Sequence, residues 1–407
     1  MPTGTKRNHV SDLRGASRLA IDATRGIADL VEAMHHTILR GPGVLGKAPR
    51  GTTRGITGLV YQGIRGVTRL VGVSLDLVLG QLSPLIAETG TGPEHEYVLA
   101  ALNGVLGDYL ASTGNPLAIQ MRLRRDGQPL DLERKALSAA LPKATGKVLL
   151  LVHGSSMSDL QWRRQGHDHG AALERDLGFT AVHLNYNSGL HVSTNGRALA
   201  DLLEKLIAQW PVPVEELTIV AHSMGGLVAR SACHVAAAAG HRWLATLRKL
   251  VFLGTPHHGA PLERGGNWLE AILGISPYTV PFARLGKIRS AGVTDLRYGS
   301  VLDEDWEQRD RFRRRRDARR PVPLPAGVAC YAIAVTKEKS PGPGHGTAGD
   351  GLVPLDSALG RHPDPEMTLA IPKSRQWIGA GMKHLDLLSS PEVYAVLLRW
   401  LAPAESQ

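Results

Sequence analysis

The segment 221–226, Ala-His-Ser-Met-Gly-Gly, contains the residues of this chain whose types and spacing most directly suggest chemistry. It lies between an apolar, strand-like run, Leu217–Val220, and a helix-like run. A serine on a sharp strand-to-helix turn is the arrangement called a nucleophile elbow. Such a turn needs small residues two positions before and after the serine. Gly225 is one of them, and Ala221 stands at the position of the usual glycine. Because the helix start favours negative charge, the segment predicts that Ser223 is a nucleophile.

A nucleophilic serine requires a base and a residue that orients this base, and both are found downstream. Asp350 lies between two glycines, after the apolar run Cys330–Val335 and a loop rich in glycine and proline. His384 lies on a predicted loop just before the final predicted helix, 392–401. We expect His384 to take the serine proton and Asp350 to orient His384. The competing acids are Asp356 and Asp386, and the competing bases are His345 and His362.

The oxyanion of the reaction needs two backbone N–H donors, and two positions fit. Met224 directly follows the nucleophile, so its N–H is the first expected donor. The run Lys147–Val152 predicts a buried strand that leads into His153-Gly154-Ser155. The glycine lets the chain bend toward the site, which makes the N–H of Ser155 the second expected donor. We expect the His153 ring to brace this loop by hydrogen bonding and to take no proton.

The order of these motifs resembles that of a known family. The chain resembles the α/β-hydrolase lipases and esterases, in particular lipases with an A-H-S-M-G elbow and bacterial members of the group related to GPI inositol-deacylases. The motifs that carry the resemblance are His153-Gly154, residues 221–226, residues 253–259 (Leu-Gly-Thr-Pro-His-His-Gly), residues 349–354 and the region of His384. They cover roughly residues 115–401. The resemblance implies that the stretch 253–259 is structural and lies beneath the active site, although His257 and His258 could line its pocket.

Further residues are expected to line the substrate site. They are His153, Gly154, His222, His257 and Trp268. Trp268 lies near the start of a long insertion, about 260–325, which follows the 253–259 motif. We expect this insertion to form a cap or lid over the site whose apolar face contacts an acyl group. A cap that only shapes the pocket and never moves is the alternative.

The pattern of elements predicts an α/β fold, a mostly parallel sheet with helices on both faces, over residues 91–402. A helix is expected over 94–109, followed by a β-hairpin over 117–132 with its turn at 125–128. Later strands are expected in runs of apolar residues that alternate with helical segments. They are residues 147–152, 181–184, 217–220, 249–253, 329–335 and 367–371.

Residues 1–90 lie outside the hydrolase pattern and predict amphipathic helices. An Arg-Gly pair recurs from Arg14 to Arg25 and from Arg54 to Arg65, a spacing of three helical turns at about 3.67 residues per turn. Regular glycines weaken these helices by about 1 kcal/mol each, so they depend on a partner surface. Either they pack on the hydrolase domain, or residues 10–86 make peripheral contact with a membrane or lipid surface.

Composition sets further limits on the class of protein. The 407 residues are 43% hydrophobic, enough for a full hydrolase core and an accessory region. Cys233 and Cys330 fall in predicted elements and read as core residues. The sequence shows no secretory signal and no long apolar span, which predicts a cytoplasmic protein. No residue pattern suggests a cofactor. His167-Asp168-His169 precedes a helix, so we interpret Asp168 as its N-cap and expect no metal there.

The net charge of +10 is concentrated between Arg309 and Arg320, which hold eight arginines between them. No nucleic-acid recognition fold or aromatic interleaving accompanies this run, so we expect no nucleic-acid partner. We interpret it as a solvated helix facing anionic lipid or an anionic product.

These patterns together predict a serine carboxylic-ester hydrolase of the lipase or esterase kind, acting in lipid metabolism on an acyl-ester or lipid substrate through an acyl-enzyme. Two alternatives stay open. The first is an acyltransferase or polyester depolymerase that uses the same three residues. The second is a lipid-surface binding protein in which hydrolase activity is secondary.

Overall fold

The computed structural model describes residues 92–260, 290–307, 317–339 and 349–403. The predicted N-terminal helical region, 1–90, and part of the predicted cap, including Trp268, lie outside these residues.

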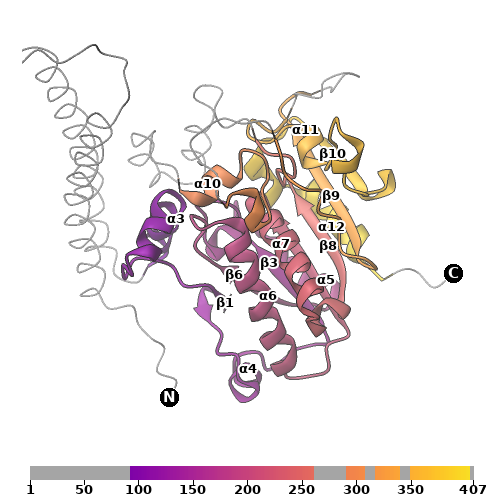
Figure 1. Cartoon of the computed structure of the whole chain (residues 1–407). Helices are drawn as coiled ribbons and strands as arrows, with labels where there is room; N and C mark the ends of the chain where they lie inside the picture. The colour runs from indigo at the N-terminus through magenta and orange to yellow at the C-terminus, as the bar shows by residue number, and fades with distance from the viewer. Residues whose placement is uncertain (1–91, 261–289, 308–316, 340–348, 404–407) are drawn as a thin grey trace, which may run out of the picture.

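An eight-stranded sheet forms the centre of the described structure (Figure 1). Its strand order is β10-β9-β8-β7-β3-β6-β1-β2. The six strands from β10 to β6 are parallel to one another, and the β1–β2 hairpin adds to β6 in the antiparallel sense. The strands are β1 (Arg122–Arg125), β2 (Gln128–Pro129), β3 (Lys147–Val152), β6 (Thr180–Asn185), β7 (Glu216–His222), β8 (Leu247–Leu253), β9 (Ala329–Thr336) and β10 (Gln376–Ala380), with a separate small pair, β4 (Arg163–Arg164) and β5 (His167–Asp168).

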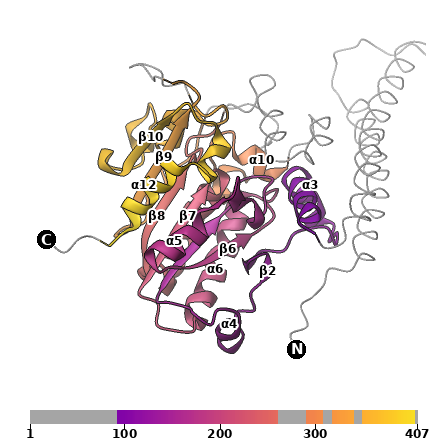
Figure 2. The ribbon, with the colours of Figure 1, turned by 180° about the vertical axis from the view of Figure 1, so that it is seen from behind.

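Helices cover both faces of this sheet. Helices α6 and α7 lie in front of it in Figure 1, and α5 and α12 lie in front when it is seen from behind in Figure 2. The predicted α/β architecture is therefore confirmed. The α-helices are α3 (Pro93–Ser112), α4 (Arg134–Ala140), α5 (His169–Leu177), α6 (Val192–Gln209), α7 (Met224–Ala239), α10 (Ala291–Asp295), α11 (Leu355–Ala358) and α12 (Pro391–Leu401). The 3₁₀ turns are η1 (Asp159–Trp162), η2 (Arg242–Ala245), η4 (Asp303–Asp305), η5 (Pro365–Met367), η6 (Lys373–Arg375) and η7 (His384–Leu388).

The apolar runs of the central strands follow from burial on both faces. In β3, Val148, Leu150 and Val152 pack in the core layer that contains α6 and α7. Leu149 and Leu151 point to the other layer, with α5 and α12. Parallel strands covered on both faces read as continuous apolar runs, which is why the strands at 147–152, 217–220 and 249–253 were predictable.

The predicted hairpin is present, and one predicted strand is wrong. The hairpin turns at Asp126-Gly127, although β1 begins only at Arg122. The run 367–371 forms no strand, because the N–H of Leu369 bonds to the carbonyl of Gly360, and the N–H of Ile371 bonds to that of Leu369. The side chains of Leu369 and Ile371 are buried without joining the sheet. The outer strand is instead β10, Gln376–Ala380.

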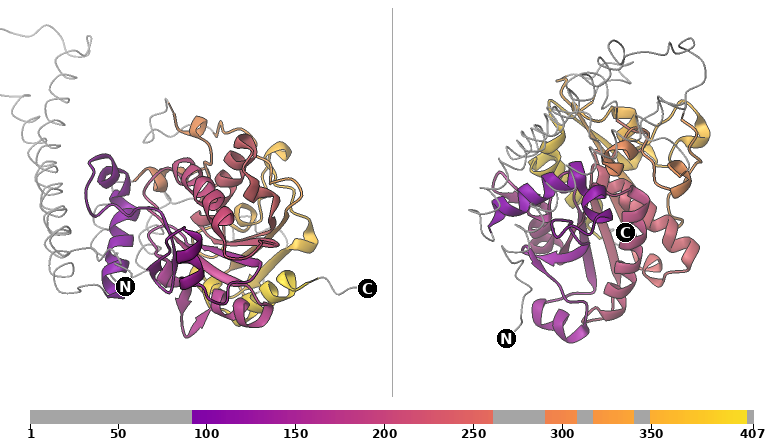
Figure 3. Two further views of the ribbon diagram at one scale, coloured as in Figure 1. Left: turned by 90° about the horizontal axis from the view of Figure 1, so that it is seen from below. Right: turned by 60° about the vertical axis from the view of Figure 1, so that its left-hand side comes forward.

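Helix α3 lies against the loops at the carboxyl edge of the sheet, beside α10 (Figure 3). A β-carbon at Gly104 would overlap the Ser156 side chain, and one at Gly107 would overlap that of Asn187. The Ser290 hydroxyl donates to the carbonyl of Gly104 at 2.6 Å. The two glycines thus let α3 pack closely on the loops that follow β3 and β6, one of which contains Ser155.

Two smaller predictions are confirmed. Cys233, on α7, and Cys330, on β9, are both buried and free. The Asp168 carboxylate accepts from the N–H of Ala171 at 3.1 Å and so caps α5. Among the described residues, no group of three or more His, Cys, Asp or Glu side chains is arranged to hold a metal ion.

The arginine-rich run differs from its predicted form in the part that is described. Residues 317–320 form no helix. The side chain of Arg319 is only 5% exposed and pairs with Asp317 at 2.7 Å. The guanidinium is held in place because it also donates to the carbonyls of His257 and Gly299. Of the helices that the structure describes, none has the length and apolar character that crossing a bilayer needs.

Candidate active site

Ser223 lies on a strained turn between β7 and α7. Its φ of 54° and ψ of −125° belong to a region that residues with a side chain rarely adopt. The Ser223 N–H donates to the carbonyl of Leu253, at the end of β8, at 2.8 Å. A β-carbon at Gly225 would lie 2.5 Å from the His153 carbonyl oxygen, so this position requires glycine. Ala221 is fully buried within β7, where its methyl group is accommodated.

Asp350 and His384 form a buried pair. The Nδ1 atom of His384 lies 2.6 Å from Oδ2 of Asp350. The other carboxylate oxygen accepts from the N–H groups of Leu352 and Val353, each at 2.8 Å. The residues are 2% and 5% exposed, respectively. These contacts fix the orientation of the carboxylate and of the imidazole, and they leave the Nε2 atom of His384 as the one that is available to accept a proton.

Topology brings the serine and this pair to one edge of the sheet. Ser223 follows β7, Asp350 follows β9 and His384 follows β10, so all lie at the carboxyl ends of parallel strands. Gly254, directly after β8, has a φ of +59°, and a β-carbon there would lie 3.2 Å from Nδ1 of His384. Since Leu253, its neighbour, accepts the N–H of Ser223, the end of β8 connects the two sides of the site.

The hydroxyl of Ser223 and the two expected oxyanion donors are unengaged. Among the described residues, no group hydrogen-bonds to the Ser223 hydroxyl, and the N–H groups of Met224 and Ser155 have no acceptor. The first belongs to the opening turn of α7, whose N–H groups lack partners within the helix. The loop of Ser155 comes close to the serine, because a β-carbon at Gly154 would lie 3.1 Å from the β-carbon of Ser223.

His153 is fully buried beneath this loop. Its ring stacks on Tyr186 at a centroid distance of 4.4 Å, and its Nδ1 donates to the carbonyl of Gly154 at 2.8 Å. The Tyr186 hydroxyl donates to the carbonyl of His153 at 2.9 Å. Burial lowers the pKa of His153 to about 4, so the ring is neutral at neutral pH. This environment suits a residue that braces the loop.

The remaining predicted residues have different environments. His222 is buried, its Nε2 lies 3.4 Å from the His384 carbonyl, and burial lowers its pKa well below the usual value. His257 is fully buried against Phe252. Of the competing acids, the carboxylate of Asp356 faces Arg361, and that of Asp386 accepts from the N–H of Lys383. The ring of the competing base His362 lies tilted beside that of His258, and His345 lies outside the described residues.

Two residues near the site escape sequence reasoning. Gly254 belongs to a motif whose resemblance implies a structural role, but the absence of a side chain there also leaves room for the ring of His384 beside β8. Arg230 is buried at 5% exposure on α7, facing His257. The available signal was its place among Leu227, Val228 and Ala229, in a helix whose surroundings are almost wholly apolar.

Comparison with protein families gives one match. Residues 143–329 match the family model described as PGAP1-like alpha/beta domain. This match spans β3 to the first residue of β9 and includes Ser223, whereas Asp350 and His384 lie beyond it. The predicted resemblance to this group of α/β-hydrolases is thereby confirmed. No curated protein matches the chain at the level of sequence.

Several solved structures are similar to the chain at low sequence identity. One is a Bacillus licheniformis lipase in its mature form, with 17% identity, 63% of this chain and 92% of that chain covered, and a TM-score of 0.41. A second is lipase B of Aspergillus fumigatus, with 12% identity, 95% of this chain and 83% of that chain covered, and a TM-score of 0.39. A third is a lipase-esterase related protein from Clostridium acetobutylicum, with 14% identity, 63% of this chain and 94% of that chain covered, and a TM-score of 0.33.

Proposed function

We propose that this chain, an α/β-hydrolase with a PGAP1-like alpha/beta domain over residues 143–329, is a serine carboxylic-ester hydrolase of the lipase or esterase kind. The observation that carries the proposal is the 2.6 Å contact between His384 and Asp350, at the sheet edge where Ser223 occupies its strained turn. A buried carboxylate that holds one ring nitrogen leaves the other free for proton transfer, which is the arrangement that activates a serine hydroxyl.

The proposed reaction proceeds in two halves. The Ser223 oxygen attacks the ester carbonyl carbon while Nε2 of His384 takes the hydroxyl proton, and the N–H groups of Met224 and Ser155 hold the oxyanion. Collapse of the tetrahedral intermediate breaks the bond to the alcohol oxygen, which leaves with the proton from His384. Water then attacks the acyl-enzyme, gives its proton to His384, and the acid departs as Ser223 recovers its proton.

The substrate class follows from the same proposal. We propose an acyl-ester or lipid substrate, with His153, Gly154, His222 and His257 around the acyl and alcohol groups. Trp268 of the predicted cap would belong to this site as well. Peripheral membrane contact through residues 10–86 stays a prediction, because it concerns residues outside the described ranges.

Hydrolysis of p-nitrophenyl esters from acetate to palmitate tests the proposal, with the wild type measured beside Ser223→Ala. We expect turnover by the wild type and its loss in the variant, and the preferred chain length sorts esterase from lipase. Circular dichroism of both proteins serves as the control for folding. A folded wild type that cleaves none of these esters contradicts the proposal, and a variant that retains turnover contradicts the role of Ser223.

A further inference from the structure

His169 is a buried histidine that the proposed chemistry does not use. It is the first residue of α5 and the last of the His167-Asp168-His169 sequence, whose aspartate caps that helix. Its ring is inaccessible to solvent. The Nε2 atom of this ring lies 3.0 Å from the carbonyl oxygen of Leu387, three residues after His384. A buried imidazole of α5 thus contacts the segment that carries the proposed base.

The contacts of the His169 ring fix its tautomer. A carbonyl oxygen only accepts, so Nε2 of His169 carries the ring proton and donates it to Leu387. Burial lowers the pKa of His169 to about 4, so the ring is neutral at neutral pH and its Nδ1 is an acceptor. The Nε2 atom of His167, 2.8 Å away, donates to that Nδ1. The partly buried His167 therefore holds His169 in the form that donates to Leu387.

The Leu387 carbonyl belongs to η7, the turn whose first residue is His384. The last carbonyls of a helical turn have no partner within it, so their position depends on neighbouring groups. The beginning of η7 is held from elsewhere. The N–H of His384 donates to the Asp350 carbonyl at 3.3 Å, and Nε2 of His222 lies 3.4 Å from the His384 carbonyl. His169 provides the contact at the other end of the turn.

The residues around this end of η7 have further contacts. The Leu387 side chain is fully buried, and a β-carbon at Gly254 would lie 2.6 Å from its Cδ1 atom. Directly after η7, the Ser389 hydroxyl donates to Oε1 of Gln165 at 2.9 Å. Gln165 lies in the turn between β4 and β5, just before α5. Two hydrogen bonds therefore join the segment 165–169 to the end of η7.

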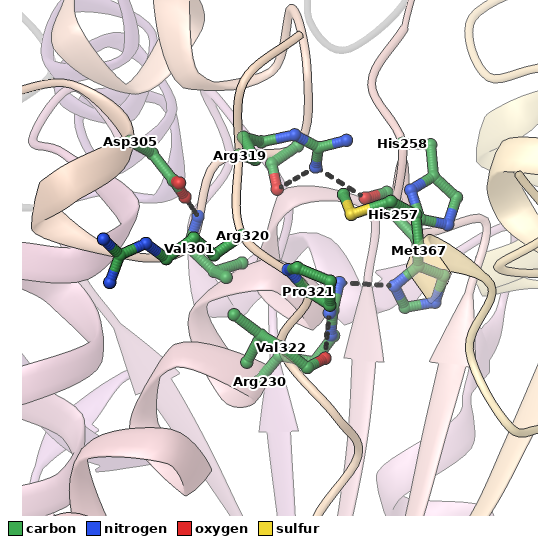
Figure 4. A pocket seen from close by; sticks show the side chains of 11 residues that line it. Arg230, His257, His258, Val301, Asp305, Arg319, Arg320, Pro321, Val322 and Met367 are labelled. Atoms are coloured by element: carbon green, nitrogen blue, oxygen red, sulfur yellow. Dashed lines mark hydrogen bonds between the residues drawn. The ribbon is translucent and has the colours of Figure 1, made fainter. Parts of the chain in front are cut away.

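The packing around His169 also involves α12, the helix that follows η7. The rings of His169 and Tyr394 are nearly parallel, with centroids 5.9 Å apart, and the ring of Trp162 meets His169 edge-on. The buried His257 has a different environment. Its ring faces the guanidinium of Arg230 on α7, whose side chains pack in the opposite layer of the core (Figure 4). Of these two buried rings, that of His169 is the one joined to the turn of the base.

We propose that His169 is a positioning residue for the catalytic base. By holding the Leu387 carbonyl, it sets the place of η7 and hence the direction in which Nε2 of His384 points. The inference rests on the proposed hydrolase function, in which that atom takes the proton of Ser223. A misplacement of about 1 Å in a catalytic group lowers a rate by about 10²-fold. His169 touches neither substrate nor reacting atoms, so its loss should affect kcat more than KM.

Two substitutions separate the hydrogen bond of His169 from its packing, and hydrolysis of a p-nitrophenyl ester measures both. His169→Phe keeps a flat ring beside Tyr394 but has no N–H. We expect its kcat to fall by about ten- to hundredfold, with KM changed by less than about twofold. His169→Gln places an amide N–H near the position of Nε2 and should restore kcat to within about threefold of the wild type. Circular dichroism of each variant is the control for folding.

The rate of covalent labelling by a fluorophosphonate gives a second readout. In this reaction the Ser223 oxygen displaces fluoride from phosphorus while its proton goes to His384. Labelling of folded His169→Phe should be at least about tenfold slower than that of the wild type. A purely structural role would lower the Tm of this variant without changing the labelling rate of its folded molecules.

Two further variants keep the test decisive if His169→Phe does not fold. His167→Ala removes the partly exposed donor to Nδ1 of His169, and its kcat should fall by about threefold. The matched control is Tyr394→Phe, which keeps the ring beside His169 and removes only the hydroxyl that donates to Asp176. Its kcat should equal that of the wild type. An unchanged kcat in His167→Ala would then overturn the inference.

The outcomes distinguish this inference from the proposed function. If the wild type is active and Ser223→Ala is not, unchanged kcat and labelling in folded His169→Phe overturn the positioning role and leave the hydrolase function standing. A loss that His169→Gln does not restore, or that Tyr394→Phe shares, overturns it as well, because packing then causes the loss. If the wild type cleaves no ester, the proposed function fails, and slower labelling of His169→Phe alone supports the positioning role. A wild type that is not labelled either overturns both.

Discussion

Two buried histidines at the same edge of the sheet have opposite electrostatic surroundings. Nδ1 of His384 lies 2.6 Å from the carboxylate of Asp350. His257 lies 3.4 Å from the guanidinium of Arg230, and burial together with that charge lowers its pKa well below the usual value. Gly254 and His257 belong to the same loop, so the two environments are close neighbours.

The contrast shows why residue type alone does not identify a catalytic base. Both rings are almost inaccessible to solvent, and both belong to motifs that the sequence singles out. Only the ring of His384 has a partner that stabilises the imidazolium formed during proton transfer. That of His257 faces a cation and is suited to donate a hydrogen bond in its neutral form. The two positions are therefore expected to differ in what their substitution affects.

The largest expected effect is on ester turnover and comes from removing the base. His384→Ala should lower kcat by about 10⁴–10⁶-fold, because the serine loses its proton acceptor. His257→Gln should lower kcat/KM by less than about tenfold, since its ring faces Arg230. Steady-state hydrolysis of a p-nitrophenyl ester measures both. A loss above a hundredfold in a folded His257→Gln would mean that His257 takes part in acyl transfer, and the contrast would fail.

The next effect concerns the carboxylate that distinguishes the two histidines. Asp350→Asn keeps the shape of the side chain but removes the charge and allows the wrong tautomer of His384, so kcat should fall by about 10⁴-fold. Asp356→Asn is the matched control, because this exposed carboxylate faces Arg361 instead of a histidine. Comparable losses in the two variants would show that Asp350 is not the residue that orients the base.

The sequence predicted the parts of this site that depend on local patterns. Apolar runs located β3, β7, β8 and β9, because these strands are buried on both faces. Parallel strands then necessarily place the segments after them at one edge. The position of the outer strand was not predictable in this way. Its residues are mixed in character, and Ile378 is 40% exposed, whereas Leu369 and Ile371 of the more apolar run 367–371 are buried outside the sheet.

The surroundings of His257 could not be predicted, for a related reason. Arg230 stands among apolar residues, which hints at its burial but not at its neighbours, and Arg319 looks like part of a solvated arginine run. Their burial depends on the packing of 317–322 against α7, which brings together residues some ninety positions apart, as in the contact of Arg230 with Val322. Local periodicity does not encode such a contact. The sequence therefore located the carboxylate-bound histidine, but it did not indicate that Arg230 faces His257.

The smallest predicted effect is on the pH dependence of stability, and it isolates His257 from His384. The pKa of His257 is lowered on folding, so below pH 6.5 the unfolded chain binds a proton that the folded chain excludes. Its contribution to stability is complete above pH 6.5 and is lost as the pH falls. Each such group lowers the free energy of unfolding by up to about 1.4 kcal/mol per pH unit.

Urea unfolding in phosphate-free buffer measures this effect. Between pH 6.5 and 5.5, the free energy of unfolding of His257→Gln should fall by about 1 kcal/mol less than that of the wild type. His234→Gln, which removes an exposed histidine on helix α7, should follow the wild type. If His257→Gln does so too, the folded protein tolerates a proton on His257, and the cationic environment assigned to this ring is wrong.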